Sequence, residues 1–320
     1  MTDRYTVETG GGRAMAQARS RRRLKINAVI GTLPMIAVAV GVYVIGIAFT
    51  FYWSFTSSKL FPNNNFVGLS QYARLWHDDR WEIAVQNIWI FGGLLIAFSL
   101  VFGYLLAIFM DQRIRQEDLF RSIFLYPFAM SLIVTGLIWQ WMLDPNFGIE
   151  NTLQSLGWTN FHFSPLVDPK TAIYGLVVAG IWQGSGVTMA ILLAGLRGID
   201  GEIWKAARVD GIPTWRVYLF IVLPMMRGAI GTAFVLQCVG VVRVYDLVVA
   251  MTGGGPGIAT NMPAVYVIQM ITSSQNVGLG MAAAVMMLTP VIVVLALIGI
   301  GRWISNRRKE AAIRRELAKA

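Results

Sequence analysis

The chain has 320 residues, of which 56% are apolar and only 14% carry a charge. Soluble domains carry about 25% charged residues, so this composition argues against a soluble protein and points to the lipid bilayer. Six apolar runs follow one another, each of 22 to 25 residues and long enough to cross the hydrocarbon core as a helix. They cover about 28–51, 88–110, 122–143, 172–195, 228–251 and 277–301. We therefore predict an all-α membrane protein with six transmembrane helices.

The formal net charge of +10 would suit a nucleic-acid partner, but its distribution does not. The segments before the first run, between the second and third, between the fourth and fifth, and after the sixth hold 22 Lys and Arg, whereas the alternate segments hold 4. Positive residues gather in cytoplasmic segments. We therefore predict a multi-pass membrane protein with both termini in the cytoplasm, in contact with membrane lipid and with no nucleic acid.

The same pattern predicts the organisation of the chain. Residues 1–27 form a basic N-terminal segment, 28–305 the six-span domain, and 306–320 a basic tail. The tail and the N-terminal segment are both expected to be cytoplasmic. Within the third run, Pro127 is expected to kink the helix.

A charged stretch, EIWKAARVDGIPTWRVYLFIVLP at 202–224, lies in the loop of about 196–224 between the fourth and fifth runs. Residues 203–209 predict two helical turns, and Gly211 predicts a stop because glycine adopts a left-handed conformation easily. Thr214 is expected to cap a second helix. One side of the first helix would carry Ile203, Ala206, Ala207 and Asp210, and another side Trp204, Lys205 and Arg208. By periodicity alone, this stretch is either a hairpin on the membrane surface or a docking element for a cytosolic partner.

Other short motifs accompany this stretch along the chain. FVGLSQY (66–72), RSIFLYPFAMS (121–131), IWQWMLDPNFGIEN (138–151), AGLRGIDGEIWKAARVDG (194–211) and YDLVVAMTGGGPG (245–257) follow in order. Together these stretches resemble the permease subunits of binding-protein-dependent ABC sugar importers, in the maltose-type carbohydrate-uptake branch. The resemblance covers about 65–305.

This resemblance implies a type I ABC importer permease fold, in which the cytoplasmic loop inserts a coupling helix into a groove on an ATPase. The matching residues are Ala206, Ala207, Asp210 and Gly211. Lys205 stands where the family usually has glutamate, and Glu202 is the candidate to take its place. The implied partners are a second homologous permease subunit, a cytosolic ATPase dimer and a periplasmic or extracellular sugar-binding protein. The implied location is the bacterial or archaeal inner (plasma) membrane.

Catalytic and metal-binding patterns are missing from the sequence. The phosphate-binding pattern G-x-x-x-x-G-K-[ST] does not occur, and His77 and His162 have no metal-type spacing. Cys238 stands alone, so no intrachain disulfide can form. We predict that the chain is not an enzyme and holds no cofactor, and that ATP and magnesium bind to the partner ATPase.

Candidate residues for a substrate pathway lie inside the apolar runs. Arg243 and Asp246 are three residues apart in the fifth run, on one helical face. An arginine at mid-bilayer costs about 2.5–3.5 kcal/mol on insertion scales. The two residues therefore either form a structural pair, or line a wet cavity with Tyr245 and bind sugar hydroxyls.

Two other apolar runs contain further candidate residues for the pathway. Gln183 and Ser185 in the fourth run either line the pathway or pack between helices. Phe128 and Ser131 in the third run match the pathway segment of the family, although an aromatic residue in a span more often serves packing.

We therefore predict a permease subunit that translocates a sugar by alternating access, driven by ATP in a partner. The sugar would be a glucose-type monosaccharide or a small oligosaccharide. An ion-coupled secondary carrier is the alternative, but such carriers usually have several intramembrane carboxylates and an internal repeat. Here Asp246 is the one clear acid within the runs, and no repeat is visible. A scaffold or receptor would leave the charged loop unexplained.

Overall fold

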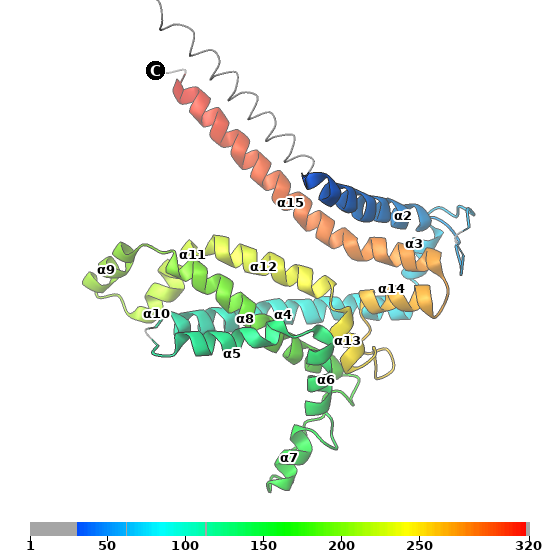
Figure 1. Ribbon diagram of the computed structural model, residues 1–320, viewed down its shortest axis with the longest axis horizontal. Coiled ribbons are helices and arrows are strands. Elements are labelled where there is room, and N and C mark those ends of the chain that lie inside the picture. Colours follow the sequence, from blue (N-terminus) through cyan, green and yellow to red (C-terminus); the bar gives the residue numbers. More distant parts are fainter. Residues whose placement is uncertain (1–30, 62, 113, 318–320) are drawn as a thin grey trace, which may run out of the picture. The chain divides into compact units, whose positions relative to one another are not determined.

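The computed structural model describes residues 31–61, 63–112 and 114–317. The predicted N-terminal segment 1–27 lies outside the described residues, as do the last three residues of the predicted tail. The chain divides into two compact units, Met1–Trp53 and Ser54–Ala320. Helices dominate the described part of both units (Figure 1), which has no strand beyond an isolated antiparallel bridge between Thr56 and Phe66.

The described part of the first unit is a single apolar helix, Gly31–Trp53. It includes a π-helical turn, η1 (Ala39–Val44), which passes into α2 (Ile45–Trp53). Its 23 residues exceed the roughly 20 that a bilayer span requires. The first predicted run is therefore confirmed as a helix of spanning length.

The second unit contains the remaining helices. In chain order they are α3 (Ser70–Leu75), α4 (Asp79–Asp111), α5 (Glu117–Ala129), α6 (Leu132–Met142), α7 (Ile149–Ser155), α8 (Ala172–Arg197), α9 (Gly201–Val209), α10 (Thr214–Arg216), η2 (Val217–Val222), α11 (Leu223–Met225), α12 (Arg227–Val242), α13 (Tyr245–Met251), α14 (Pro263–Thr272) and α15 (Val277–Leu317).

The described residues do not contain six unbroken spans. Besides the helix of the first unit, only α4 and α8 are long and apolar enough to cross a membrane without interruption. The helix pairs α5 with α6 and α10–α11 with α12 bend by 98° and 73°, and counting each pair as one span raises the number to five. The sixth predicted run lies in α15, where the apolar stretch Val277–Pro290 is shorter than a span.

The third run was expected to kink at Pro127, but the chain breaks between Met130 and Ser131, one turn later. Proline removes one backbone hydrogen bond and α5 continues for two more residues after it. The Ser131 hydroxyl then accepts the backbone N–H of Val134 at 3.2 Å and begins α6. The break is therefore completed by a new helix cap and is not a bend at the proline itself.

The expected cap at Thr214 is also wrong. Pro213 occupies the capping position, with an extended ψ of 139°, and no side chain caps α10. The helix continues through η2 and α11, and the 73° bend follows at Met226, two residues after Pro224. The bend between α11 and α12 thus follows shortly after a proline, as the break between α5 and α6 does.

The core of the second unit is built on the interface between α4 and α8, which pack along their length. Gly103 of α4 faces Thr188 of α8 so closely that an added Cβ would lie 2.6 Å from the threonine methyl. Gly180 of α8 similarly faces Phe91 and Leu95 of α4. Small residues let the two backbones approach, which is the usual way that helices associate without a hydrophobic driving force in lipid.

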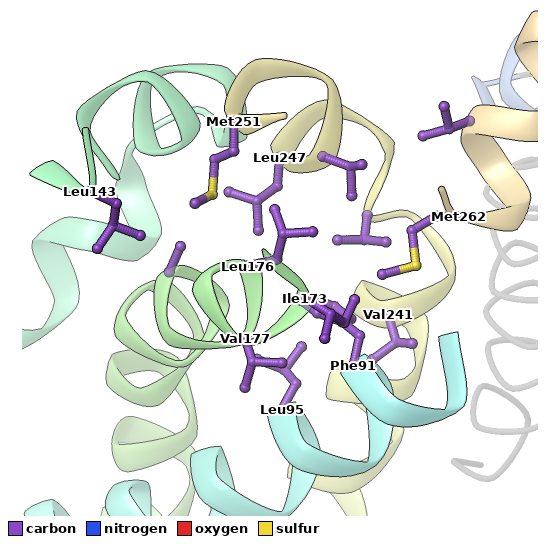
Figure 2. Packing of buried hydrophobic residues seen from close by; sticks show 14 residues of the cluster. Phe91, Leu95, Leu143, Ile173, Leu176, Val177, Val241, Leu247, Met251 and Met262 are labelled. Carbon is purple, nitrogen blue, oxygen red and sulfur yellow. The ribbon is translucent and has the colours of Figure 1, made fainter. Parts of the chain in front are cut away.

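Two apolar clusters extend from this interface. Figure 2 shows the first core cluster, in which side chains of α4 and α8 converge with those around α13. Its labelled members are Phe91, Leu95, Leu143, Ile173, Leu176, Val177, Val241, Leu247, Met251 and Met262. The second core cluster lies on the later halves of α4 and α8 and includes residues of α9, η2 and α12. The two clusters thus lie at opposite ends of α8. Residues of α4 and α12 contribute to both, whereas α13 contributes only to the first and α9 and η2 only to the second.

The contact between α5 and α8 yields a test of this packing. An added Cβ at Gly186 would collide with the backbone carbonyl oxygen of Phe124, which cannot rotate away. We expect Gly186→Ala to destabilise the fold by about 1–3 kcal/mol, because it overpacks a close helix contact. The measurement is the fraction of monodisperse detergent-solubilised protein after heating. Gly93→Ala in α4 is the control, since nothing lies within 4 Å of its Cβ; equal loss in both variants would contradict the predicted contact.

Candidate functional site

The charged stretch begins with a capped helix. The side chain of Asp200 accepts the backbone N–H of Glu202 at 3.0 Å and so begins α9. The predicted helix at 203–209 is therefore confirmed, with its start two residues earlier. The cap was not predicted, although an aspartate directly before a helical pattern is the signal for it.

The end of α9 is fixed by its backbone. The N–H of Ile212 donates to the carbonyl of Ala207 at 3.0 Å, and the N–H of Gly211 donates to that of Arg208 at 3.2 Å. This pair of bonds is a Schellman ending, which needs a left-handed residue. Gly211 supplies it with φ of +67°, as the sequence predicted.

The two faces of α9 differ from the expected ones. Ala207 is 5% exposed within the second core cluster, and the ring of Trp204 lies edge-on to Tyr218 at 5.2 Å. Ala206, which was expected to share a face with Ala207, is exposed, and Val209 is 87% exposed. The inner face is thus formed by Trp204 and Ala207, because the tertiary contact with η2 decides which stripe is buried.

The exposed face of α9 carries charge. Lys205 Nζ donates to Glu202 Oε1 at 2.8 Å, and both side chains are mostly exposed. Exposed pairs of this kind contribute about 0–1 kcal/mol. Arg208 and Asp210 are also exposed. Glu202, the candidate to replace the missing glutamate, therefore neutralises Lys205 within the same helix.

Polar bonds hold this loop to the end of α4. The Tyr104 hydroxyl donates to the carbonyl of Tyr218 at 2.8 Å. At the end of α8, Arg197 Nη2 donates to Glu117 Oε1 at 2.6 Å and to the carbonyl of Met110 at 3.2 Å. These bonds connect α4, α5, α8 and η2 at the point where α9 begins, so α9 rests on a rigid base.

The break between α5 and α6 contains two of the predicted pathway residues. Ser131 caps α6 and Phe128 is exposed. Gln183 of α8, 9% exposed, donates its amide N–H to the carbonyl of Met130 at 3.2 Å. This bond satisfies a carbonyl that the break has freed, which irregular backbone at membrane depth requires. Gln183 thus supports the break.

The fifth run contains a second break. α12 ends at Val242 and α13 begins at Tyr245, so Arg243 and Asp246 do not lie on one continuous helix as expected. Both side chains are exposed, and the ion pairs of the described residues include none between them. Tyr245 packs against the first core cluster. The reading of Arg243 and Asp246 as a structural ion pair is therefore not supported.

The second halves of the two broken helices pack on each other. α6 and α13 are neighbours (Figure 1), and an added Cβ on Gly136 would lie 2.5 Å from the Cβ of Ala250 and 3.2 Å from the carbonyl oxygen of Leu247. A shift of one half-helix would therefore have to move the other.

One buried amide group, that of Gln237, was not identified from the sequence. Gln237 of α12 donates to Thr188 Oγ1 at 2.9 Å and to the carbonyl of Gly184 at 3.4 Å, joining α12 to α8. The signal was a lone amide in an otherwise apolar stretch. Ser185, in contrast, bonds the carbonyl of Trp182 in its own helix at 3.4 Å.

A polar cluster closes the segment around α7. Glu150 Oε1 accepts Nδ1–H of His162 at 3.0 Å, and Glu150 Oε2 accepts the backbone N–H of Phe163 at 3.1 Å. The bond from His162, followed by the bond from Phe163, lowers the pKa of Glu150 below its ordinary value. His162 is thus paired with a carboxylate, and the described residues contain no group of three or more His, Cys, Asp or Glu that could hold a metal ion.

Comparison with known families places these features in context. Residues 99–308 match the family model described as "Binding-protein-dependent transport system inner membrane component". This range includes both helix breaks and α9. The match confirms the resemblance drawn from the ordered sequence motifs.

Individual relatives agree with the family match. A probable ABC transporter permease of Pyrococcus horikoshii is 36% identical and covers 81% of this chain and 89% of its own. The xylose/arabinose import permease of Haloferax volcanii is 33% identical over 69% of this chain and 70% of its own. A solved bacterial alginate ABC transporter, in complex with an alginate-pentasaccharide-bound periplasmic protein, shares the fold with a TM-score of 0.73 at 17% identity, covering 88% of this chain and 94% of that chain.

The Glu150 cluster gives a pH-dependent prediction. Because its folded pKa is lowered, the carboxylate stabilises the α7 segment above its unfolded pKa of about 4.3, and this contribution is lost as the pH falls through the folded value. We expect the protection of 149–163 from hydrogen exchange, measured against the intrinsic rate at each pH, to decrease as the pH falls below this unfolded value. Glu150→Gln should exchange faster at pH 7 and lose this acid response. Glu82→Gln, at an exposed position of α4, is the control and should behave as the parent chain.

Proposed function

Because the chain belongs to the binding-protein-dependent transport system inner membrane components, we propose that it carries a sugar across the inner membrane by ATP-driven alternating access. Membership makes it the permease subunit of an ABC sugar importer, not its ATPase, and the ion-coupled carrier and the scaffold are set aside. The observation that supports ATP-driven coupling is α9, a capped and anchored helix that offers Ala206 and Val209 outward. The proposed sugar is a glucose-type monosaccharide or a small oligosaccharide.

The proposed assembly has four further subunits. A second homologous permease would complete the pathway, a cytosolic ATPase dimer would bind ATP and magnesium, and an extracytoplasmic protein would deliver the sugar. The alginate transporter of similar fold, solved with its periplasmic protein, supports the last of these. The distribution of Lys and Arg supports cytoplasmic termini and a cytoplasmic α9. α15 would supply the sixth span.

The proposed motion starts at α9. Closure of the ATPase pair would displace α9, and the displacement would pass to α8 and α4 through the second core cluster, which contains Ala207. A rigid element with two positions is what such coupling requires. The Schellman ending at Gly211 keeps α9 from fraying under this load.

The proposed sugar contacts lie beside the helix breaks. Arg243 and Asp246 are exposed and unpaired with each other, so the guanidinium and the carboxylate are free to bind hydroxyl groups. Tyr245, Phe128, Ser131 and Ser185 are the further candidates along this pathway. Gln183 serves it by holding the freed carbonyl of Met130.

Gly211 gives a test of coupling. A side chain at φ of +67° costs about 1–2 kcal/mol, which would open the Schellman ending without touching a neighbour. We expect Gly211→Val to lower sugar uptake by about tenfold, the effect of 1.4 kcal/mol, while the variant still assembles with its partners. Uptake and ATP hydrolysis would be measured on the assembled transporter in proteoliposomes.

Gly201→Val is the matched control for this experiment. Gly201 lies in the same helix, also with open space around its Cβ, but without a positive φ. Normal uptake by a fully inserted Gly211→Val variant would refute the role of α9.

Asp246 gives a test of the substrate contact. A hydrogen bond to a charged group contributes about 1.5–3 kcal/mol, so we expect Asp246→Ala to reduce sugar uptake by about 10- to 100-fold at unchanged protein level. Radiolabelled uptake in a strain deleted for the native gene is the measurement. Asp118→Asn, at an exposed position of α5, is the control. Unchanged uptake kinetics in Asp246→Ala would remove this residue from the pathway.

A further inference from the structure

A polar cavity lies in the second unit, apart from the proposed sugar contacts. It has a volume of about 450 Å³, within the range of about 300–1,000 Å³ for small-molecule sites. Four segments enclose it: the end of α6, the loop after it, the loop before α8, and the end of α13 with its following loop. Its polar lining includes Gln140, Asp144 and Thr252. None of the pathway residues named above lines it.

One oxygen of the Asp144 carboxylate is held by hydrogen bonds, and the other is available to a ligand. Its Oδ1 accepts the backbone N–H groups of Asn146 at 2.8 Å and Phe147 at 3.2 Å. Within the described part of the chain Oδ2 has no partner, and neither has the amide of Gln140. The Asp144 carboxylate is therefore a fixed hydrogen-bond acceptor, and the Gln140 amide on the same cavity wall can both donate and accept.

The rest of the lining is apolar or backbone. Leu166 and Val167 form one wall, Val249 and Met251 another, and Gly253 and Gly255 add only backbone. Aliphatic walls suit the C–H faces of a sugar ring, and the polar groups suit its hydroxyls, which both donate and accept. A metal or a polyvalent cation fits less well, because Asp144 is the only acidic residue of the lining.

The short helix α13 contributes to both the cavity and the proposed pathway. Asp246 stands near the start of α13 and Thr252 directly after its end. Six residues of helix rise about 9 Å. A ligand in the cavity would thus lie within two helical turns of Asp246 along α13.

We propose that this cavity is a relay site, in which Asp144 and Gln140 bind a neutral, hydroxyl-rich ligand before it reaches Asp246. The ligand is the transported sugar, so this proposal rests on the proposed function. Asp144→Asn tests it without disturbing the loop, because asparagine keeps the oxygen that accepts from Asn146 and Phe147 and replaces the free oxygen with an amide group.

The experiment uses protection from thiol labelling in the assembled transporter. Cys238 is the chain's one cysteine, so Cys238→Ser provides a background in which Val167→Cys reports on the cavity. Glucose, xylose and maltose are the probes, and uptake of each is measured in the same cells. We expect a transported sugar to slow labelling of Val167→Cys. Asp144→Asn should raise the sugar concentration that gives half of this protection by about tenfold, since hydrogen bonds to charged acceptors are stronger than those to neutral ones.

Two controls are matched to the site. Ser155→Cys, exposed on α7 and outside the cavity, should label at one rate with and without sugar. Asp168→Asn should leave the protection unchanged, since Asp168 also accepts a backbone N–H through Oδ1 but does not line the cavity.

The outcomes separate the two proposals. Uptake without protection of Val167→Cys, or protection that Asp144→Asn does not weaken, would overturn the relay site and leave the proposed function standing. No uptake and no protection with any of the three sugars would count against both.

Discussion

The close packing of α4 against α8 is the contact on which the rest of the second unit depends. Glycine at 103 and 180 allows the two backbones to approach, and side chains of both helices then contribute to each core cluster. α8 is 26 residues long, which corresponds to about 39 Å. One cluster fixes α9 at one end of this helix, and the other fixes α13 at the opposite end. A displacement of α9 therefore has a continuous packed path toward the helix breaks.

The helix breaks show how backbone polarity is managed inside an apolar protein. A break frees carbonyl and N–H groups that cannot turn to water at membrane depth. Here Gln183 satisfies the carbonyl of Met130, and Ser131 satisfies the N–H of Val134. The second halves, α6 and α13, then pack at Gly136, so the two irregular segments support each other. Discontinuous helices are where transporters commonly place their substrate contacts, which agrees with the exposed charges of Arg243 and Asp246.

The structure of α9 separates an anchored face from an exposed one. Trp204 and Ala207 hold the helix to the second core cluster, whereas Ala206 and Val209 remain exposed. Lys205 and Glu202 neutralise each other on the exposed side. A groove that receives this helix would therefore meet an apolar ridge beside a balanced pair, not the single negative charge typical of the family.

The sequence by itself determined the membrane class, the positions of most helices, the C-terminal end of α9 and the family. These follow from local properties: the length of apolar runs, the left-handed glycine at 211, and the order of short motifs. Only the tertiary structure decided where the third and fifth runs break, because the groups that complete a break, such as Gln183 for Met130, lie more than 50 residues away. It also decided which face of α9 is buried, since Tyr218 on η2 selects Trp204 and Ala207. The cavity at Asp144 needed the structure for the same reason, because its four walls meet only when distant segments fold together.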